Sequence, residues 1–183
     1  RGPYDVIVHN AALGPDQDRA ILTEDGLERI LQVNVVAPYL LSAMLSLPQR
    51  IVFVGSDAAF SGSPAVDLAP PDPWDGHAAY ADSKLLLTML AFELAHRHTD
   101  RQINVVHPGW VRTRMGGPRA ALPLSDGADT PVWLATSDEA IARRGGQYVH
   151  RRRAEPAPVA ANDPALRARL IARLAEVTGE HLR

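Results

Sequence analysis

The chain has 183 residues, of which 46% are hydrophobic and 22% charged, a balance typical of one ordinary globular domain, so residues 1–183 are expected to form a single domain. Its formal net charge of −2 gives no broad electrostatic reason to bind DNA, RNA or an anionic membrane, and no nucleic-acid partner is expected. The absence of cysteine excludes disulfides, thiolate metal sites and cysteine nucleophiles and fits a reducing compartment, for which the cytoplasm is the default expectation.

Short apolar runs rich in β-branched residues alternate along the chain with helical patterns. The runs predict strands buried on both faces of a parallel sheet, at Val6–His9, Ile51–Gly55, Ile103–His107 and Gln147–His150. Helices are predicted over Asp25–Leu47, as two helices or one bent helix, and over Gly76–His98, Ala128–Ala135 and Pro164–Val177. This alternation predicts βαβ units with right-handed crossovers and an α/β fold.

Proline and glycine mark two predicted loops, Ser61–Pro73 and Met115–Gly127. Both follow strands, so they are expected at the carboxyl edge of the sheet, where open α/β sheets bind ligands. Residues Arg151–Asn162 are predicted to be a connector to the last helix. The longest apolar stretches, Val35–Leu47 and Leu85–Ala95, are too short for a bilayer of about 30 Å, so no membrane span is expected.

Tyr80 and Lys84 stand four residues apart in a helical pattern. Both side chains therefore emerge on one face, with Cβ atoms roughly 6 Å apart. A nearby ammonium favours the phenolate and lowers a tyrosine pKa from about 10 toward the range of an acid/base catalyst. The spacing alone is common in helices, so its surroundings decide what it means.

Two further polar residues are candidates for the same site. Ser56 lies just past a predicted strand, where its hydroxyl can donate to a carbonyl oxygen, or cap a turn instead. Asn34 is an amide within an apolar helical stretch and needs a partner if buried, so a purely structural hydrogen bond is its alternative role. His96 and His98 lie on different helical faces with no further ligand at a suitable spacing, so no metal site is expected.

The order of these motifs resembles the short-chain dehydrogenase/reductase (SDR) family of the classical type. The motifs are His9-Asn10-Ala11-Ala12 after the first strand, Asn34 in a helix, Ser56 after the next strand, Tyr80 with Lys84, and Pro108-Gly109-Trp110-Val111-Arg112-Thr113 after the third strand. The tail, with Gly145-Gly146-Gln147-Tyr148 and a closing amphipathic helix, is similar to the retinol-dehydrogenase-like branch. The resemblance implies a Rossmann-like three-layer domain with a parallel sheet, lacking the first βα units of the family.

The resemblance also implies an enzyme that interconverts a small or lipophilic alcohol and its ketone or aldehyde by hydride transfer with NADP or NAD. Tyr80 would be the general acid/base, and Lys84 would lower its pKa and bind the nicotinamide ribose. Ser56 would polarise the substrate oxygen, and Asn34 would position a water for proton relay. Cofactor contacts are implied at Asn10, Ala11, Ala12, Tyr80, Lys84, Pro108, Gly109, Val111 and Thr113.

The sequence departs from the family pattern mainly at its front. The glycine-rich turn that binds the pyrophosphate is absent, as is the residue that selects the nucleotide, so NADP is only slightly favoured over NAD. The chain alone is therefore expected to be inactive. Either the missing segment exists outside this chain, which is the favoured expectation, or a second protomer of a homo-oligomer covers the open edge of the first strand. Smaller departures are Ala12 for the usual glycine and Gly55 where serine is frequent.

Two other functions stay open on the same scaffold. One is a truncated, non-enzymatic homologue that acts as a binding or assembly module. The other is a cofactor-independent lyase or isomerase that uses Tyr80 as an acid/base.

Overall fold

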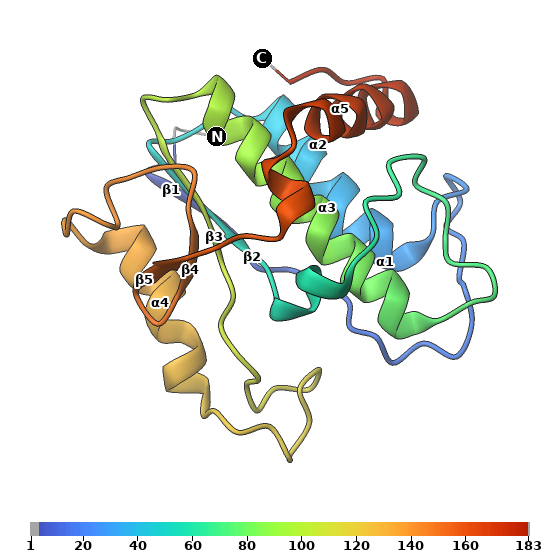
Figure 1. The fold of residues 1–183 in the computed structure, drawn as a ribbon, viewed down its shortest axis with the longest axis horizontal. Helices are drawn as coiled ribbons and strands as arrows, with labels where there is room; N and C mark the ends of the chain where they lie inside the picture. The colour runs from blue at the N-terminus through green and yellow to red at the C-terminus, as the bar shows by residue number, and fades with distance from the viewer. Residues whose placement is uncertain (1–3, 183) are drawn as a thin grey trace. The chain divides into compact units, whose positions relative to one another are not determined.

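The computed structural model describes residues 4–182, which form two compact units (Figure 1). The sheet unit consists of residues 4–10, 47–57 and 91–157, and the helical unit consists of residues 11–46, 58–90 and 158–182. Each unit is thus assembled from three separate segments of the chain. The interpretation of residues 1–183 as one domain stays a prediction.

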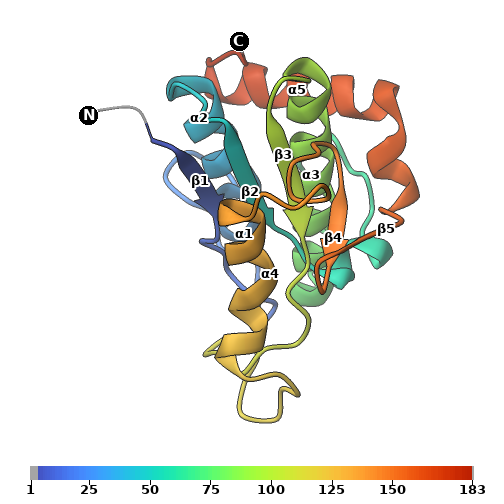
Figure 2. The ribbon, with the colours of Figure 1, turned by 90° about the vertical axis from the view of Figure 1, so that its left-hand side faces the viewer.

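The sheet unit contains a five-stranded sheet with the strands in sequence order (Figure 2). The strands are β1 (Val6–His9), β2 (Arg50–Val54), β3 (Gln102–Val106), β4 (Tyr148–His150) and β5 (Arg153–Glu155). The first four are parallel, and β5 pairs with β4 in the antiparallel sense. Ile7 lies opposite Ile51, and Ile51 lies opposite Ile103. The four predicted strands are therefore confirmed, with ends that differ by one residue at most.

Helix α4 (Leu124–Thr136) packs on one face of this sheet (Figure 2). Its Trp133 and Leu134 join a buried apolar cluster with Val52, Val106 and Val149 from β2, β3 and β4. The residues that alternate with these along β2 and β3, such as Ile51 and Val105, are also buried. Because both faces of the strands are buried, their apolar runs are continuous and not alternating. Burial of this cluster fixes α4 against the strands whose carboxyl ends carry the candidate site.

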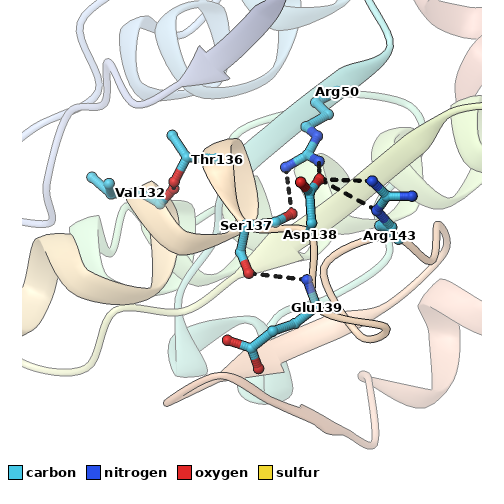
Figure 3. Close-up of polar contacts among 7 residues, drawn as sticks. All are labelled: Arg50, Val132, Thr136, Ser137, Asp138, Glu139 and Arg143. Carbon is cyan, nitrogen blue, oxygen red and sulfur yellow. Dashed lines mark hydrogen bonds and ion pairs between the residues drawn. The ribbon is translucent and has the colours of Figure 1, made fainter.

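A polar network links the end of α4 to the start of β2 (Figure 3). Arg50 donates to the carbonyl oxygen of Ser137 at 2.7 Å and to the Asp138 carboxylate at 3.1 Å. Arg143 donates to the same carboxylate at 2.9 Å, and this bond, above all, lowers the pKa of Asp138. Because Asp138 is exposed, the network orients these segments more than it stabilises them.

The helical unit is built around two long helical segments and the C-terminal helix. Its elements are α1 (Arg29–Leu31), the π-helical turn η1 (Gln32–Val36), α2 (Ala37–Met44), the 3₁₀ turns η2 (Asp57–Ser61) and η3 (Val159–Asn162), α3 (Gly76–Arg97) and α5 (Pro164–Thr178). The first residue of η2 and the last turns of α3 belong to the sheet unit. Glu28 caps α1 by accepting from the Leu31 N–H at 3.0 Å, and Asp163 caps α5. In place of the predicted helical region Asp25–Leu47, the structure has one continuous helical run over residues 29–44, shorter than predicted at both ends and with a π turn in the middle.

Two of the expectations on loops are wrong. The predicted connector Arg151–Asn162 contains strand β5 and the turn η3. Helix α4 begins four residues before the predicted Ala128, inside the predicted loop Met115–Gly127. Gly127 indicated a loop, but it lies in the helix, and the residue is glycine there because a Cβ would approach Val111 Cγ2 to 2.5 Å.

Among residues 4–182, no helix has both the length and the apolar character needed to cross a membrane.

Candidate active site

Tyr80 and Lys84 lie on α3 in the helical unit and face each other as predicted. The Lys84 Nζ atom is 5.7 Å from the centre of the Tyr80 ring. Lys84 is only 3% exposed, and this burial lowers its pKa to about 8, whereas Tyr80 is half-buried. The pair therefore places a desolvated ammonium beside a phenol that solvent or a ligand can reach.

Lys84 is also chemically unusual within this sequence. It is the only lysine among the 183 residues, and the other 18 basic side chains are arginines. An arginine stays charged at any ordinary pH, whereas a buried lysine can lose its proton near neutrality. Lys84 is therefore the one position where a lysine, and not an arginine, carries the charge.

Asn34 lies in the π turn η1, is 1% exposed, and has its side chain fully engaged. Its Oδ1 accepts from the Leu13 N–H at 2.8 Å, and its Nδ2 donates to the Leu13 carbonyl at 3.0 Å and to Ser83 Oγ at 2.9 Å. The Ser83 hydroxyl in turn donates to the Tyr80 carbonyl at 2.7 Å. These hydrogen bonds match the structural role that was its alternative, and they fasten α3 at the turn that carries Tyr80 and Lys84. The catalytic role of Asn34 stays a prediction.

The backbone at Asn34 offers a different group. Pro38, four residues further on, has no N–H, so the Asn34 carbonyl lacks the usual α-helical donor. The helix accommodates this by widening, with the Ala37 N–H bonded to the carbonyl of Gln32, five residues back. Such π turns are frequent at functional sites. A carbonyl at this position can accept a hydrogen bond from water.

Ser56 lies in the sheet unit, two residues past the end of β2. It is half-buried, its hydroxyl donates to Asp57 at 3.2 Å, and its carbonyl accepts from the Tyr148 hydroxyl at 2.9 Å. The structure thus places Ser56 at the carboxyl end of a central strand, as predicted. Packing explains why the preceding residue, Gly55, is a glycine and not the frequent serine, because a Cβ there would approach Val105 Cγ1 to 2.7 Å.

The predicted cofactor residues divide between the two units. Ala11, Ala12, Tyr80 and Lys84 belong to the helical unit, and Asn10, Pro108, Gly109, Val111 and Thr113 belong to the sheet unit. In the sheet unit, Asn10 follows β1 and Pro108 follows β3, so both stand at the carboxyl edge. Gly109 has a φ of 80°, and a Cβ there would also approach Leu122 Cδ1 to 2.7 Å, so only glycine fits.

His9 is a polar residue at this edge that was not among the predicted site residues. It ends β1, stacks on Phe53 with ring centres 4.5 Å apart, and is 8% exposed. Burial lowers its pKa to about 4, so the imidazole is neutral at physiological pH. Its Nε2 has no hydrogen-bond partner among residues 4–182. The signal in the sequence was a histidine closing an otherwise apolar strand.

Within the described residues 4–182, no group of three or more potential metal ligands is found.

Comparison with known proteins identifies the family. The family model described as short chain dehydrogenase matches residues 1–121. The chain therefore belongs to the short-chain dehydrogenase/reductase family.

Two curated relatives show how much of the family's length the chain represents. Short-chain dehydrogenase chyC of Penicillium rubens is 33% identical over 167 residues, which cover 86% of this chain and 62% of the relative. Human retinol dehydrogenase 14 is 33% identical over 169 residues, which cover 79% of this chain and 49% of the relative. The similarity to the retinol-dehydrogenase-like branch is thus confirmed, and the chain spans less than two thirds of either relative.

Solved structures confirm the Rossmann-like α/β fold. A protein from Mycobacterium paratuberculosis has a TM-score of 0.79 at 24% identity, with 98% of this chain and 68% of that chain covered. A blue fluorescent protein from a metagenomic library, solved in complex with NADPH, has a TM-score of 0.59 at 28% identity, with 82% and 64% covered. The first likeness concerns the fold alone.

Proposed function

We propose that the protein is an NAD(P)-dependent oxidoreductase that interconverts a small or lipophilic alcohol and its ketone or aldehyde, with Tyr80 as the acid/base. The observation that carries the proposal is the buried Lys84 ammonium beside Tyr80 on one face of α3. Membership of the short-chain dehydrogenase/reductase family supports the same reaction class. No observation favours the lyase or the non-enzymatic alternative.

In the direction of reduction, the Tyr80 hydroxyl gives its proton to the carbonyl oxygen of the substrate. The phenolate left behind is stabilised by the ammonium of Lys84, which burial has already removed from water. Ser56 donates a hydrogen bond to the same substrate oxygen and polarises the carbonyl before the proton moves. In oxidation these steps run in reverse, and Tyr80 accepts the alcohol proton.

The residues present fit the nicotinamide end of the cofactor. Asn10 follows β1 and Pro108 follows β3, the two strands on either side of β2, so both stand at the carboxyl edge where open α/β sheets bind ligands. The buried ammonium of Lys84 is a donor for ribose hydroxyls. A bound NAD(P) supplies or takes up the hydride. The NADPH complex of the blue fluorescent protein supports this choice of cofactor, and the preference between NADP and NAD stays open.

Proton supply to Tyr80 is assigned to the backbone of Asn34, not to its side chain. Both amide hydrogens of Asn34 are already used, so the side chain has no donor left for a relay water. The carbonyl, which lacks its usual donor because of Pro38, is the group that would hold the water on the way to Lys84.

The test is the Tyr80→Phe variant of the full-length protein, assayed with NADPH and NADH against a panel of ketones and aldehydes. Loss of one hydroxyl removes the proton donor, so turnover should fall by several orders of magnitude while the melting temperature stays unchanged. Tyr4→Phe, which alters an exposed tyrosine elsewhere, is the matched control and should keep full activity. Activity of Tyr80→Phe within tenfold of wild type contradicts the proposed role.

A further inference from the structure

The sheet unit contains a hollow of about 470 Å³ at the carboxyl end of β3. Its walls are the residues after β3, the turn between β4 and β5, and the first turns of α4. This volume lies within the range of small-molecule sites. Of the residues assigned above, Pro108, proposed to contact the cofactor, lines the hollow, whereas none of the proposed catalytic side chains does.

The turn between β4 and β5 is held in an unusual conformation. Its two residues, Arg151 and Arg152, have φ values of 46° and 61°, in the left-handed region. Two-residue turns of this kind normally carry asparagine, aspartate and glycine, because other side chains are strained there. Backbone strain that persists in a folded protein is often tied to function, so the choice of two arginines needs a reason beyond turn formation.

Arg152 explains how the turn is held. Its Nε donates to the Asp129 carboxylate at 2.8 Å, and a second guanidinium nitrogen pairs with the other oxygen of the same carboxylate. The guanidinium also lies 6.0 Å from the Trp133 ring centre. Arg152 thus anchors the turn to α4, and Asp129 matches its charge.

Arg151, unlike Arg152, does not anchor the turn to another element. Its side chain lines the hollow, and among residues 4–182 no hydrogen bond or ion pair engages its guanidinium. Next to it on the wall are His107 and His150, whose rings stack 3.9 Å apart with 7° between their planes. His150 Nδ1 donates to the His107 carbonyl at 3.0 Å, which fixes the orientation of the ring.

The charges of the wall define what can bind. Arg151 offers a guanidinium with several donors in a planar fork, which suits a carboxylate or a phosphate group. Burial, above all, lowers the pKa of His107; His150 and Arg151 act in the same direction, and Asp57 and Glu155 act against it. The neutral form of His107 is therefore favoured, and the positive charge of this part of the wall comes from Arg151. Asp126 on α4 lies on the same hollow and accepts a hydrogen bond from Ser125. Its negative charge repels an anion, so we expect the bound oxyanion on the Arg151 side.

We propose that this hollow binds the carboxylate or phosphate oxyanion of a small ligand, with the Arg151 guanidinium as its principal partner beside the His107–His150 pair. The inference goes beyond the oxidoreductase activity, because it requires neither Tyr80 nor a cofactor.

The experiment is a titration of the full-length protein with two probes, inorganic phosphate and lactate, at constant ionic strength. The readouts are the melting temperature and the imidazole NMR signals of His107 and His150. Wild type should show a saturable response of both readouts at roughly millimolar probe. A response to phosphate only or to lactate only identifies the source of the oxyanion, and either result supports the site.

The decisive variant is Arg151→Gly, which removes the guanidinium and relieves the left-handed backbone at the same position. It should melt at a higher temperature than wild type without probe and lose the saturable response. Arg153→Gln, an exposed arginine that does not line the hollow, is the matched control and should respond as wild type does. The absence of a saturable response in wild type, or an undiminished response in Arg151→Gly, overturns the proposal.

Discussion

Replacing Lys84 by methionine should stabilise the folded protein at neutral pH while removing activity. Burial holds the pKa of Lys84 at about 8, against an ordinary value of 10.5. At about 1.4 kcal/mol for each pH unit of difference, the folded state bears a cost of about 3 kcal/mol for keeping this lysine charged. Methionine has a similar shape and no charge, so its gain at pH 7 is up to about 3 kcal/mol.

The pH dependence follows from the direction of this pKa change. Below pH 8, Lys84 is charged in both the folded and the unfolded protein, and the cost is complete. Between pH 8 and 10.5 the folded protein has released a proton that the unfolded chain still holds, so wild-type stability rises with pH. The advantage of Lys84→Met should therefore shrink across this window and vanish above it.

Urea denaturation of both proteins at pH 7 and pH 10 measures the effect. With a slope of about 2 kcal/mol per molar urea, the midpoint of Lys84→Met should lie up to about 1.5 M above that of wild type at pH 7. Arg143→Met, at an exposed position, controls for the loss of a surface cation and should show no such pH-dependent gain. If Lys84→Met is less stable than wild type at pH 7 and the difference does not change with pH, burial is not what sets the pKa of Lys84.

Two further substitutions test the packing of the site. Gly55→Ser should lower the free energy of unfolding, measured by urea denaturation, by about 1–3 kcal/mol, because the added Cβ would approach Val105 Cγ1 to 2.7 Å. An unchanged free energy of unfolding would show that β3 can shift to make room for the side chain. Asn34→Ala should lower the free energy of unfolding by about 2–4 kcal/mol, because the Leu13 N–H and C=O lose their hydrogen-bond partners. A loss below about 1 kcal/mol, or increased hydrogen exchange confined to residues remote from Leu13, would contradict this role of the Asn34 side chain.

The sheet could be predicted because local sequence and tertiary burial agree there. The runs at Val6–His9 and Ile51–Gly55 are apolar and β-branched, and the structure buries them in a parallel sheet. Strand β5 carried no such signal, because Arg153–Glu155 is exposed on both faces and owes its extended form to pairing with β4. Short strands that depend on a neighbour for their conformation are outside the reach of pattern reasoning.

The candidate site was predictable to a similar degree. The spacing of Tyr80 and Lys84 placed both on one helical face, which the structure confirms through their contact. The partner of Asn34 could not be predicted, because Leu13 and Ser83 are distant in sequence and meet it only in the folded unit. Burial of His9 was equally hidden, since it depends on the Phe53 ring from the neighbouring strand. The catalytic roles, the cytoplasmic location and a homo-oligomeric state stay predictions.

The π turn also decides where this segment can change length. The turn takes up one residue more than an α-helical turn, so deleting a single residue from Gln32–Val36 would remove that extra residue and leave α2 facing the same way. A deletion in the regular helix just before Tyr39 would instead turn Tyr39 by about 100°. Tyr39 is fully buried and donates to the Glu180 carbonyl at 2.7 Å, and it would then point away from the C-terminal segment that it now contacts. Changes in chain length are therefore tolerated in the π turn and not in α2.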